Sequence, residues 1–170
     1  QRQMCIRDRP HGITIRGYTG AETVEVVTAR NEAGDIPAWD TYPAKYEFFM
    51  PLTAKKAGLL LRSLEFRVKG YVPGTMRTVL RKYGSTTALA DKFTDIVRGY
   101  NDVVLDMGSI ALEKGVEYQL YFAASNNFYP PSVQPSWVAA NDCIDIAQGS
   151  AYYGDDTTLI FSGTVVLQET

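Results

Sequence analysis

Aromatic and amide residues that are suited to ligand binding gather in one long irregular segment, residues 125–142. The segment supplies Asn126, Asn127, Phe128, Tyr129, Gln134 and Trp137. Aromatic rings stack on the weakly polar C–H faces of sugar rings, and side-chain amides hydrogen-bond to sugar hydroxyls. Structureless loops longer than about 12–15 residues are uncommon in compact domains and are often functional. We predict that Tyr129 and Trp137, with Asn126 and Asn127, contact a ligand; the alternative is that the rings pack against the edge of the domain.

Two further clusters combine aromatic and acidic side chains. One is Tyr152 and Tyr153 followed by Asp155 and Asp156, and the other consists of Trp39, Asp40 and Tyr42. We add Tyr152 and Tyr153 to the predicted ligand-binding residues. Asp155 and Asp156 are the candidates for a structural Ca²⁺ site, which needs several converging oxygen ligands. Apart from that alternative, the sequence predicts no cofactor.

The residue types needed for catalysis are scarce. The chain has no Gly-x-Ser-x-Gly elbow, no phosphate-binding Gly-x4-Gly-Lys-Ser/Thr loop and no His-Glu-x-x-His motif, and its one histidine is His11. Pairs of carboxylates remain, and a glycosidase needs two of them about 5–10 Å apart across a cleft. The pairs are Asp155 with Asp156, Asp142 with Asp145, and Glu47 with Glu65. We expect a protein without catalytic residues, with a polysaccharide-active enzyme as one alternative.

The elements that must position these residues are strands, because the dominant hydrophobic period is two. Residues 63–69 place Leu64, Phe66 and Val68 on one face and charged residues on the other. The same alternation runs through residues 45–52, 75–82, 116–123 and 158–168, with a break expected near residues 162–163. Glycine-containing turns separate these runs at short intervals, which is typical of a sandwich or barrel. We therefore predict an all-β fold, an antiparallel two-sheet β-sandwich.

The first nine residues resemble translated sequencing-adapter read-through at the ends of environmental gene fragments, so we treat residues 1–9 as an artefact. The alternative is a genuine basic arm. We assign residues 39–170 to the sandwich domain and residues 10–38 to a strand, a linker or the end of a preceding domain, and we expect the parent protein to extend upstream. Excluding Cys5 leaves Cys143, for which we expect a buried, unreactive free thiol.

The net charge and the hydropathy of the sequence indicate which classes of binding partner to expect. The chain carries a formal net charge of −2; residues 1–9 contribute +2 (three Arg against one Asp), which leaves −4 for the remainder. Nucleic-acid binding needs clustered cations, and the Lys and Arg residues here, such as Arg77, Arg81 and Lys82, are interspersed along expected strands. Apolar runs stay well short of the ~20 residues that span a bilayer. We expect neither a nucleic-acid partner nor membrane insertion.

The order of motifs between residues 46 and 126 resembles that of jelly-roll β-sandwich modules related to carbohydrate-binding and galactose-binding-like domains. An aromatic strand leads to Leu-Leu-Leu-Arg-Ser-Leu-Glu-Phe-Arg-Val, and the segment from Leu112 to Tyr118 reads Leu-Glu-Lys-Gly-Val-Glu-Tyr. Such modules are appended to secreted bacterial proteins and to phage tail or fibre proteins.

This resemblance implies a jelly-roll-like fold and a binding module of a larger extracellular or phage virion protein. The implied partner is a glycan or another host-cell surface ligand, and the implied location is extracellular or on the virion surface. One alternative is a structural or assembly module of a tail fibre or capsid surface, which forms a homo-oligomer or packs on neighbouring virion subunits. Many functions share the sandwich, so the fold does not select among these.

Overall fold

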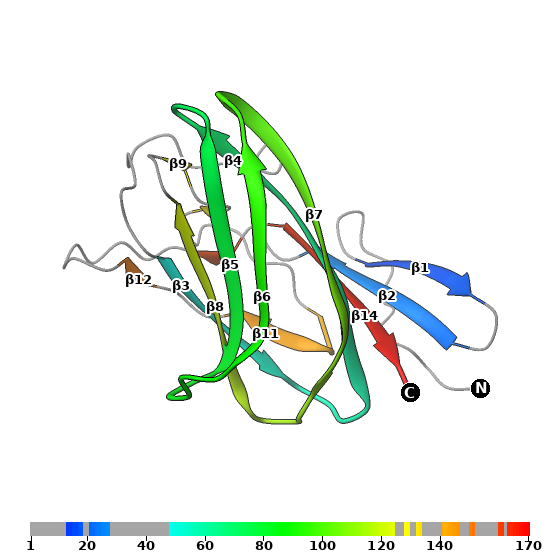
Figure 1. The fold of residues 1–170 in the computed structure, drawn as a ribbon. Coiled ribbons are helices and arrows are strands. Elements are labelled where there is room, and N and C mark those ends of the chain that lie inside the picture. The colour runs from blue at the N-terminus through cyan, green and yellow to red at the C-terminus, as the bar shows by residue number, and fades with distance from the viewer. Residues whose placement is uncertain are drawn as a thin grey trace.

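The computed structural model describes residues 13–18, 21–27, 48–124, 128–129, 132–133, 141–146, 150–151, 160–161 and 163–170. Side chains are described for residues 48–123, 141–145 and 163–170. All regular elements within these ranges are β-strands, and every strand pair is antiparallel. The prediction of an all-β, two-sheet sandwich is confirmed (Figure 1).

The strands form two six-stranded sheets and one short pair. The first sheet runs in the order β1 (Ile13–Tyr18), β2 (Ala21–Val27), β14 (Gly163–Glu169), β4 (Leu59–Gly70) and β7 (Gly99–Leu112), and β9 (Phe128–Tyr129) pairs with β4. The second runs in the order β11 (Ile144–Ile146), β3 (Phe48–Ala54), β8 (Glu117–Ala124), β5 (Gly74–Lys82) and β6 (Ala88–Ile96), and β12 (Ser150–Ala151) pairs with β3. The short pair is β10 (Ser132–Val133) with β13 (Ile160–Phe161).

The eight principal strands have jelly-roll connectivity. Among them, the first sheet has the order β2-β14-β4-β7 and the second the order β3-β8-β5-β6. Along the chain, β2, β4, β7 and β14 therefore alternate with strands of the opposite sheet, except where β5 leads directly to its neighbour β6. A double-sheet arrangement of eight antiparallel strands with these crossovers is the jelly roll.

The core lies between the two sheets and is filled by the inward side chains of the alternating strands. In β3, Phe48, Met50 and Leu52 are buried, while the residues between them are half-buried. Phe66 of β4 meets Phe122 of β8 edge to face, with ring centroids 5.5 Å apart, so this pair joins the two sheets. The inward faces predicted for residues 63–69 and 75–82 are confirmed by the burial pattern.

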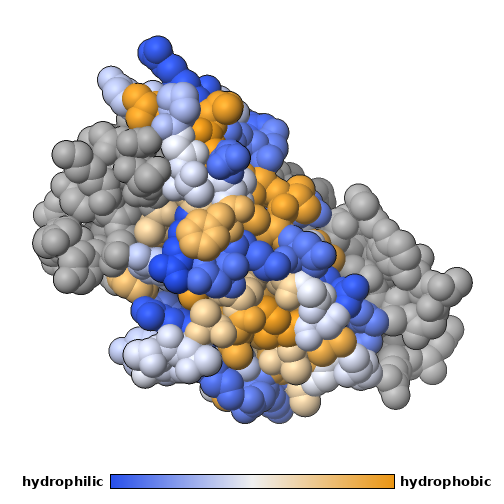
Figure 2. All heavy atoms as spheres, in the orientation of Figure 1, coloured by the Kyte–Doolittle hydropathy of each residue, from blue (hydrophilic) through white to orange (hydrophobic). Residues whose placement is uncertain are grey.

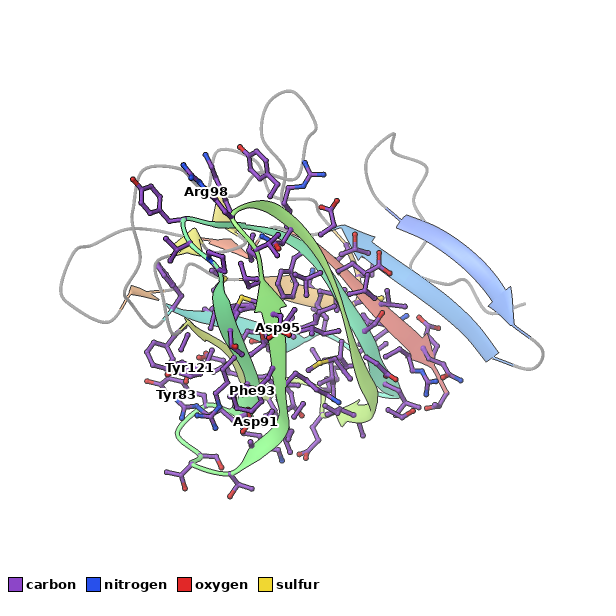
Figure 3. The ribbon with its side chains drawn as sticks, turned by 45° about the horizontal axis from the view of Figure 1, so that its top comes forward. Tyr83, Asp91, Phe93, Asp95, Arg98 and Tyr121 are labelled. Atoms are coloured by element: carbon purple, nitrogen blue, oxygen red, sulfur yellow. The ribbon has the colours of Figure 1, made fainter. Side chains whose placement is uncertain are left out.

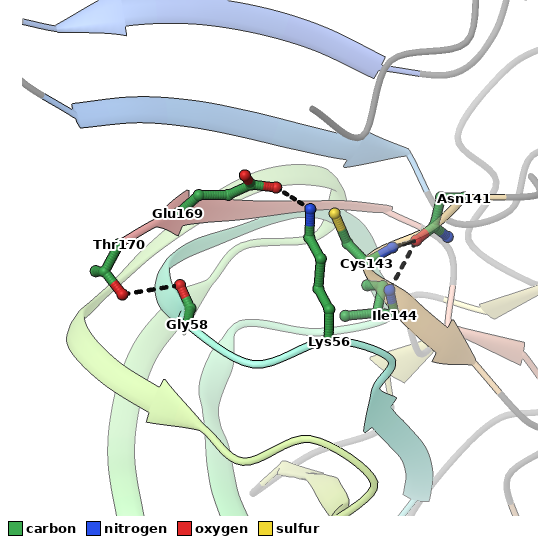
Figure 4. A network of polar contacts seen from close by, with 7 residues as sticks. All are labelled: Lys56, Gly58, Asn141, Cys143, Ile144, Glu169 and Thr170. Atoms are coloured by element: carbon green, nitrogen blue, oxygen red, sulfur yellow. Dashed lines mark hydrogen bonds and ion pairs between the residues drawn. The ribbon is translucent and has the colours of Figure 1, made fainter. Parts of the chain in front are cut away.

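The C-terminal residues of and after β14 form an ion pair and hydrogen bonds with the β3–β4 turn. Lys56 in that turn forms an ion pair with Glu169, and the hydroxyl of Thr170 donates to the carbonyl of Gly58 at 3.1 Å (Figure 4). The backbone N–H of Thr170 donates to the same carbonyl at 2.9 Å. β14 also pairs with β2 and β4 along its length. The predicted break near residues 162–163 is confirmed, since β13 ends at Phe161 and β14 begins at Gly163 with different partners.

Cys143 departs from the expectation of a free thiol. It is fully buried as expected, but it is disulfide-bonded. The only other cysteine of the chain, Cys5, lies outside the described residues. The side-chain oxygen of Asn141 accepts hydrogen bonds from the backbone N–H of Cys143 at 2.9 Å and of Ile144 at 2.7 Å, which fixes the entry into β11 (Figure 4). Sequence pattern alone indicated the burial but not the bond.

The described part of the chain contains no helix that is long and apolar enough to cross a membrane.

Candidate functional site

The outer face of the second sheet carries aromatic, cationic and amide side chains in close contact. It is formed by the outward positions of β3, β8, β5 and β6, which alternate with the core positions of the same strands. We call it the aromatic–arginine face and define it by Phe49, Arg77, Val79, Arg81, Asp91, Phe93, Gln119 and Tyr121. Figure 3 shows Tyr121, Asp91 and Phe93 together over this sheet.

Register places these residues in rows across the sheet. Phe49, Tyr121, Val79 and Asp91 are opposite one another on consecutive strands. The rings of Phe49 and Tyr121 have centroids 5.1 Å apart and are tilted by 38°. Cross-strand neighbours of this kind hold each other in position, so the rings are displayed on a rigid base.

Arg81 lies beside the aromatic pair. Its guanidinium carbon is 5.5 Å from the ring centroid of Phe49 and 6.0 Å from that of Tyr121, within cation–π range. Its Nε and Nη2 both donate to Oε1 of Gln119, at 3.0 and 2.9 Å. Among the described residues no carboxylate forms an ion pair with Arg81. Within the described residues, the positively charged side chain of Arg81 is therefore held by the neutral amide of Gln119.

Arg77 is arranged differently, because it has a carboxylate partner. Its Nε and Nη2 donate to the two oxygens of Asp91 at 2.8 and 2.7 Å, a two-point contact. The same guanidinium lies 5.7 Å from the ring centroid of Phe93, whose side chain is 67% exposed. The hydrogen bonds from Arg77 lower the pKa of the Asp91 carboxyl below its ordinary value, and they outweigh the opposing effect of desolvation.

We expect Arg77→Met to raise the pKa of Asp91 towards the ordinary value for aspartate. The folded-state pKa lies below the unfolded one, so the pair stabilises the fold above the ordinary pKa and loses this contribution as pH falls through the folded-state value. NMR titration of the side-chain carboxyl carbons measures the shift. Asp102 is the internal control, because its pKa is lowered by Arg67 on the other sheet and should not move. An unchanged Asp91 pKa in Arg77→Met would contradict the assignment.

A second exposed surface lies where β4 and β6 end. Tyr71, Val72, Val97 and Tyr100 are between 41% and 61% exposed there, and we call them the strand-end patch. Lys69 lies over the ring of Tyr100 at 5.2 Å. Figure 3 shows Arg98 at this end of the molecule, and Figure 2 shows apolar and charged side chains interleaved on the face that β5, β6 and β7 present.

The residues predicted from the sequence to bind ligand fall mostly outside the described part of the chain. This applies to Asn126, Asn127, Trp137, Tyr152 and Tyr153, to the Ca²⁺ candidates Asp155 and Asp156, and to Trp39, Asp40 and Tyr42. The backbone of Tyr129 lies in β9, opposite Lys69 of β4. The strand that directly precedes Tyr152, β12, pairs its two residues with Phe48 and Phe49 at the border of the aromatic–arginine face.

Of the candidate carboxylate pairs, the structure describes both residues only for Asp142 and Asp145, at the start of β11. Asp145 forms an ion pair with Lys55 at 3.4 Å, whereas Glu65 lies in β4 on the other sheet and its proposed partner Glu47 is outside the described residues. Within the described residues no group of three or more His, Cys, Asp or Glu side chains is placed to hold a metal ion.

Sequence reasoning missed the aromatic–arginine face because it looked for ligand contacts outside the alternating strands. Phe49 and Tyr121 occupy outward positions, next to inward aromatic residues such as Phe48 and Phe122. A large ring at a position that alternation assigns to solvent was the available signal. Arg77 is exposed and Arg81 is half-buried, and each guanidinium also lies over a ring, that of Phe93 for Arg77 and that of Phe49 for Arg81.

Comparison with protein-family models and with curated proteins finds no match to this chain.

Proposed function

We propose that the chain is a non-catalytic module that binds carbohydrate through the aromatic–arginine face, as part of a larger extracellular or virion-surface protein. The observation that supports this most directly is the cluster of Phe49, Tyr121, Arg81 and Gln119, in which two rings and two hydrogen-bonding side chains, all half-buried, share one outward-facing surface.

The chemistry of this cluster suits a sugar. The C–H face of a pyranose ring is apolar enough to stack on Phe49, Tyr121 or the exposed Phe93. The hydroxyl groups around the edge of the same ring form hydrogen bonds with neighbouring donors and acceptors. The guanidinium groups of Arg77 and Arg81 supply donors, and the amide of Gln119 supplies both a donor group and an acceptor. Because all these residues lie on paired strands, little conformational entropy is lost when a ligand binds.

We expect Phe93→Ala and Tyr121→Ala each to weaken glycan binding by about tenfold, since truncation of a central aromatic contact typically costs more than 1 kcal/mol. Affinity electrophoresis and isothermal titration calorimetry against a panel of neutral and charged polysaccharides measure the change. Phe93 is the cleaner site, because its ring is 67% exposed and contributes little to the core.

Val104→Ala is the matched control. Val104 is 68% exposed on β7 in the other sheet, so its truncation removes a similar exposed apolar group away from the aromatic–arginine face. Thermal unfolding of all variants establishes that they are folded. Absence of binding across the whole panel, or an equal loss in Val104→Ala, would refute the proposal.

A further inference from the structure

We infer that the glycan bound by the aromatic–arginine face carries carboxylate groups, as uronic and sialic acids do, and that Arg81 is the residue that binds them. This inference rests on the proposed function and specifies its ligand class. The two arginines of the face differ in their partners.

Among the described residues, Arg77 forms an ion pair with a carboxylate, whereas Arg81 forms none. Both oxygens of Asp91 accept hydrogen bonds from Arg77. Arg81 instead uses two donors on a single neutral oxygen of Gln119. Glu117 is the next outward residue of β8 beyond Gln119, and it forms no ion pair with Arg81. Within the described residues, the positive charge of Arg81 is therefore not balanced by a contacting carboxylate.

The position of Arg81 is also fixed before a ligand arrives. Gln119 holds one edge of the guanidinium, and the rings of Phe49 and Tyr121 lie within 6.0 Å of its carbon. A long side chain normally loses conformational entropy when a ligand fixes it in place. The contacts of Arg81 already restrict its side chain in the folded protein, so less entropy is lost on binding. A prepositioned arginine is better suited to a fixed ionic contact than a freely moving one.

The remaining donors of Arg81 match a carboxylate in number and geometry. Guanidinium has five N–H donors, and the two contacts to Gln119 use the Nε hydrogen and one of the two on Nη2. The edge formed by Nη1 and Nη2 keeps one donor from each nitrogen for a planar, two-oxygen acceptor. A hexuronate presents such a group beside an apolar C–H face, and Phe49 and Tyr121 lie next to Arg81 to receive that face.

The test compares ligands that differ only in charge. Polygalacturonate and its methyl-esterified form have the same sugar backbone, and titration of the full chain with each isolates the contribution of the carboxylate. Alginate and polysialic acid extend the test to other carboxylated glycans, and dextran sulfate tests sulfate in place of carboxylate. We expect at least one carboxylated glycan to bind about tenfold more tightly than its ester or than neutral glycans, because hydrogen bonds to charged groups are the stronger class.

Variants separate the role of Arg81 from that of charge in general. Arg81→Gln should abolish the preference for the carboxylated form. Arg81→Lys keeps the positive charge but lacks the two parallel N–H donors of a guanidinium, so it should retain only part of the preference. Arg67→Gln is the matched control and should retain the preference, since Arg67 lies on β4 in the other sheet, where it is paired with Asp102. If Arg81→Gln does not fold, Arg81→Lys alone decides: an unchanged preference would overturn the assignment.

The outcomes distinguish this inference from the proposed function. Equal binding of polygalacturonate and its ester, binding of neutral glycans only, or a preference for dextran sulfate alone would overturn the carboxylate assignment and leave glycan binding standing. Failure to bind any glycan in the panel, charged or neutral, would refute both.

Discussion

Gly70→Ala is expected to lower the free energy of unfolding by about 3 kcal/mol, the upper part of the usual range for forcing extra atoms into a packed site. A Cβ atom at residue 70 would lie 2.3 Å from the carbonyl oxygen of Val97 and 2.7 Å from Cγ2 of Ile96. The Val97 backbone is held in place, because its N–H donates to Oδ1 of Asn101 and its carbonyl accepts from Nδ2 of Asn101, both at 2.9 Å. The clash therefore cannot be relieved without breaking these hydrogen bonds.

Gly84→Ala is the control for this prediction. Gly84 has a φ of +76° in the β5–β6 turn, and a Cβ added there would meet nothing within 4 Å. Only the backbone penalty of the left-handed conformation remains, about 1 kcal/mol. Urea unfolding of both variants, monitored by circular dichroism, gives the two free energies. Equal losses would show that the close approach of Gly70 to residue 97 is not a constraint on the fold.

Thr78→Val is expected to have the opposite sign and to stabilise the protein by about 1–2 kcal/mol, which is the usual penalty for a buried hydroxyl without a hydrogen bond. Thr78 is fully buried at an inward position of β5, and within the described residues its Oγ1 has no hydrogen-bond partner. Valine has nearly the same shape and removes the uncompensated hydroxyl, and its second methyl group fills the space. The midpoint of urea or thermal unfolding should rise accordingly.

Thr75→Val provides the comparison on the same strand. The hydroxyl of Thr75 is half-buried and contacts Oδ1 of Asp95 at 3.4 Å, so its replacement removes a polar contact and should bring no gain. A Thr78→Val protein that is no more stable than Thr75→Val would mean that the buried hydroxyl has found a partner in solution.

The strands of the core were predictable because their alternation is local information. In residues 63–69 the side chains of Leu64, Phe66 and Val68 repeat every second residue, and the structure buries all three. The order of strands within each sheet was not predictable, because it depends on pairing between segments far apart in sequence. Nothing local to residues 163–169 indicates that they lie between β2 and β4.

The candidate site was missed for the same reason. Arg81 and Gln119 are 38 residues apart, and only the pairing of β5 with β8 places them opposite each other. Phe49 reaches Tyr121 through the pairing of β3 with β8. The sequence shows that these aromatic, arginine and glutamine residues are present. Whether they lie on one surface depends on the register of the strand pairs, and no short stretch of the sequence specifies that register.

The central place of β14 in its sheet has a kinetic consequence. Its partners in β4 lie about a hundred positions earlier, as in the pairing of Ser63 with Val166. Nearly the whole module must therefore leave the ribosome before this sheet closes, and the large loop makes the closure slow. Until then β4 presents open backbone groups along one side, which is the form in which a nascent chain is most prone to pair with its neighbours.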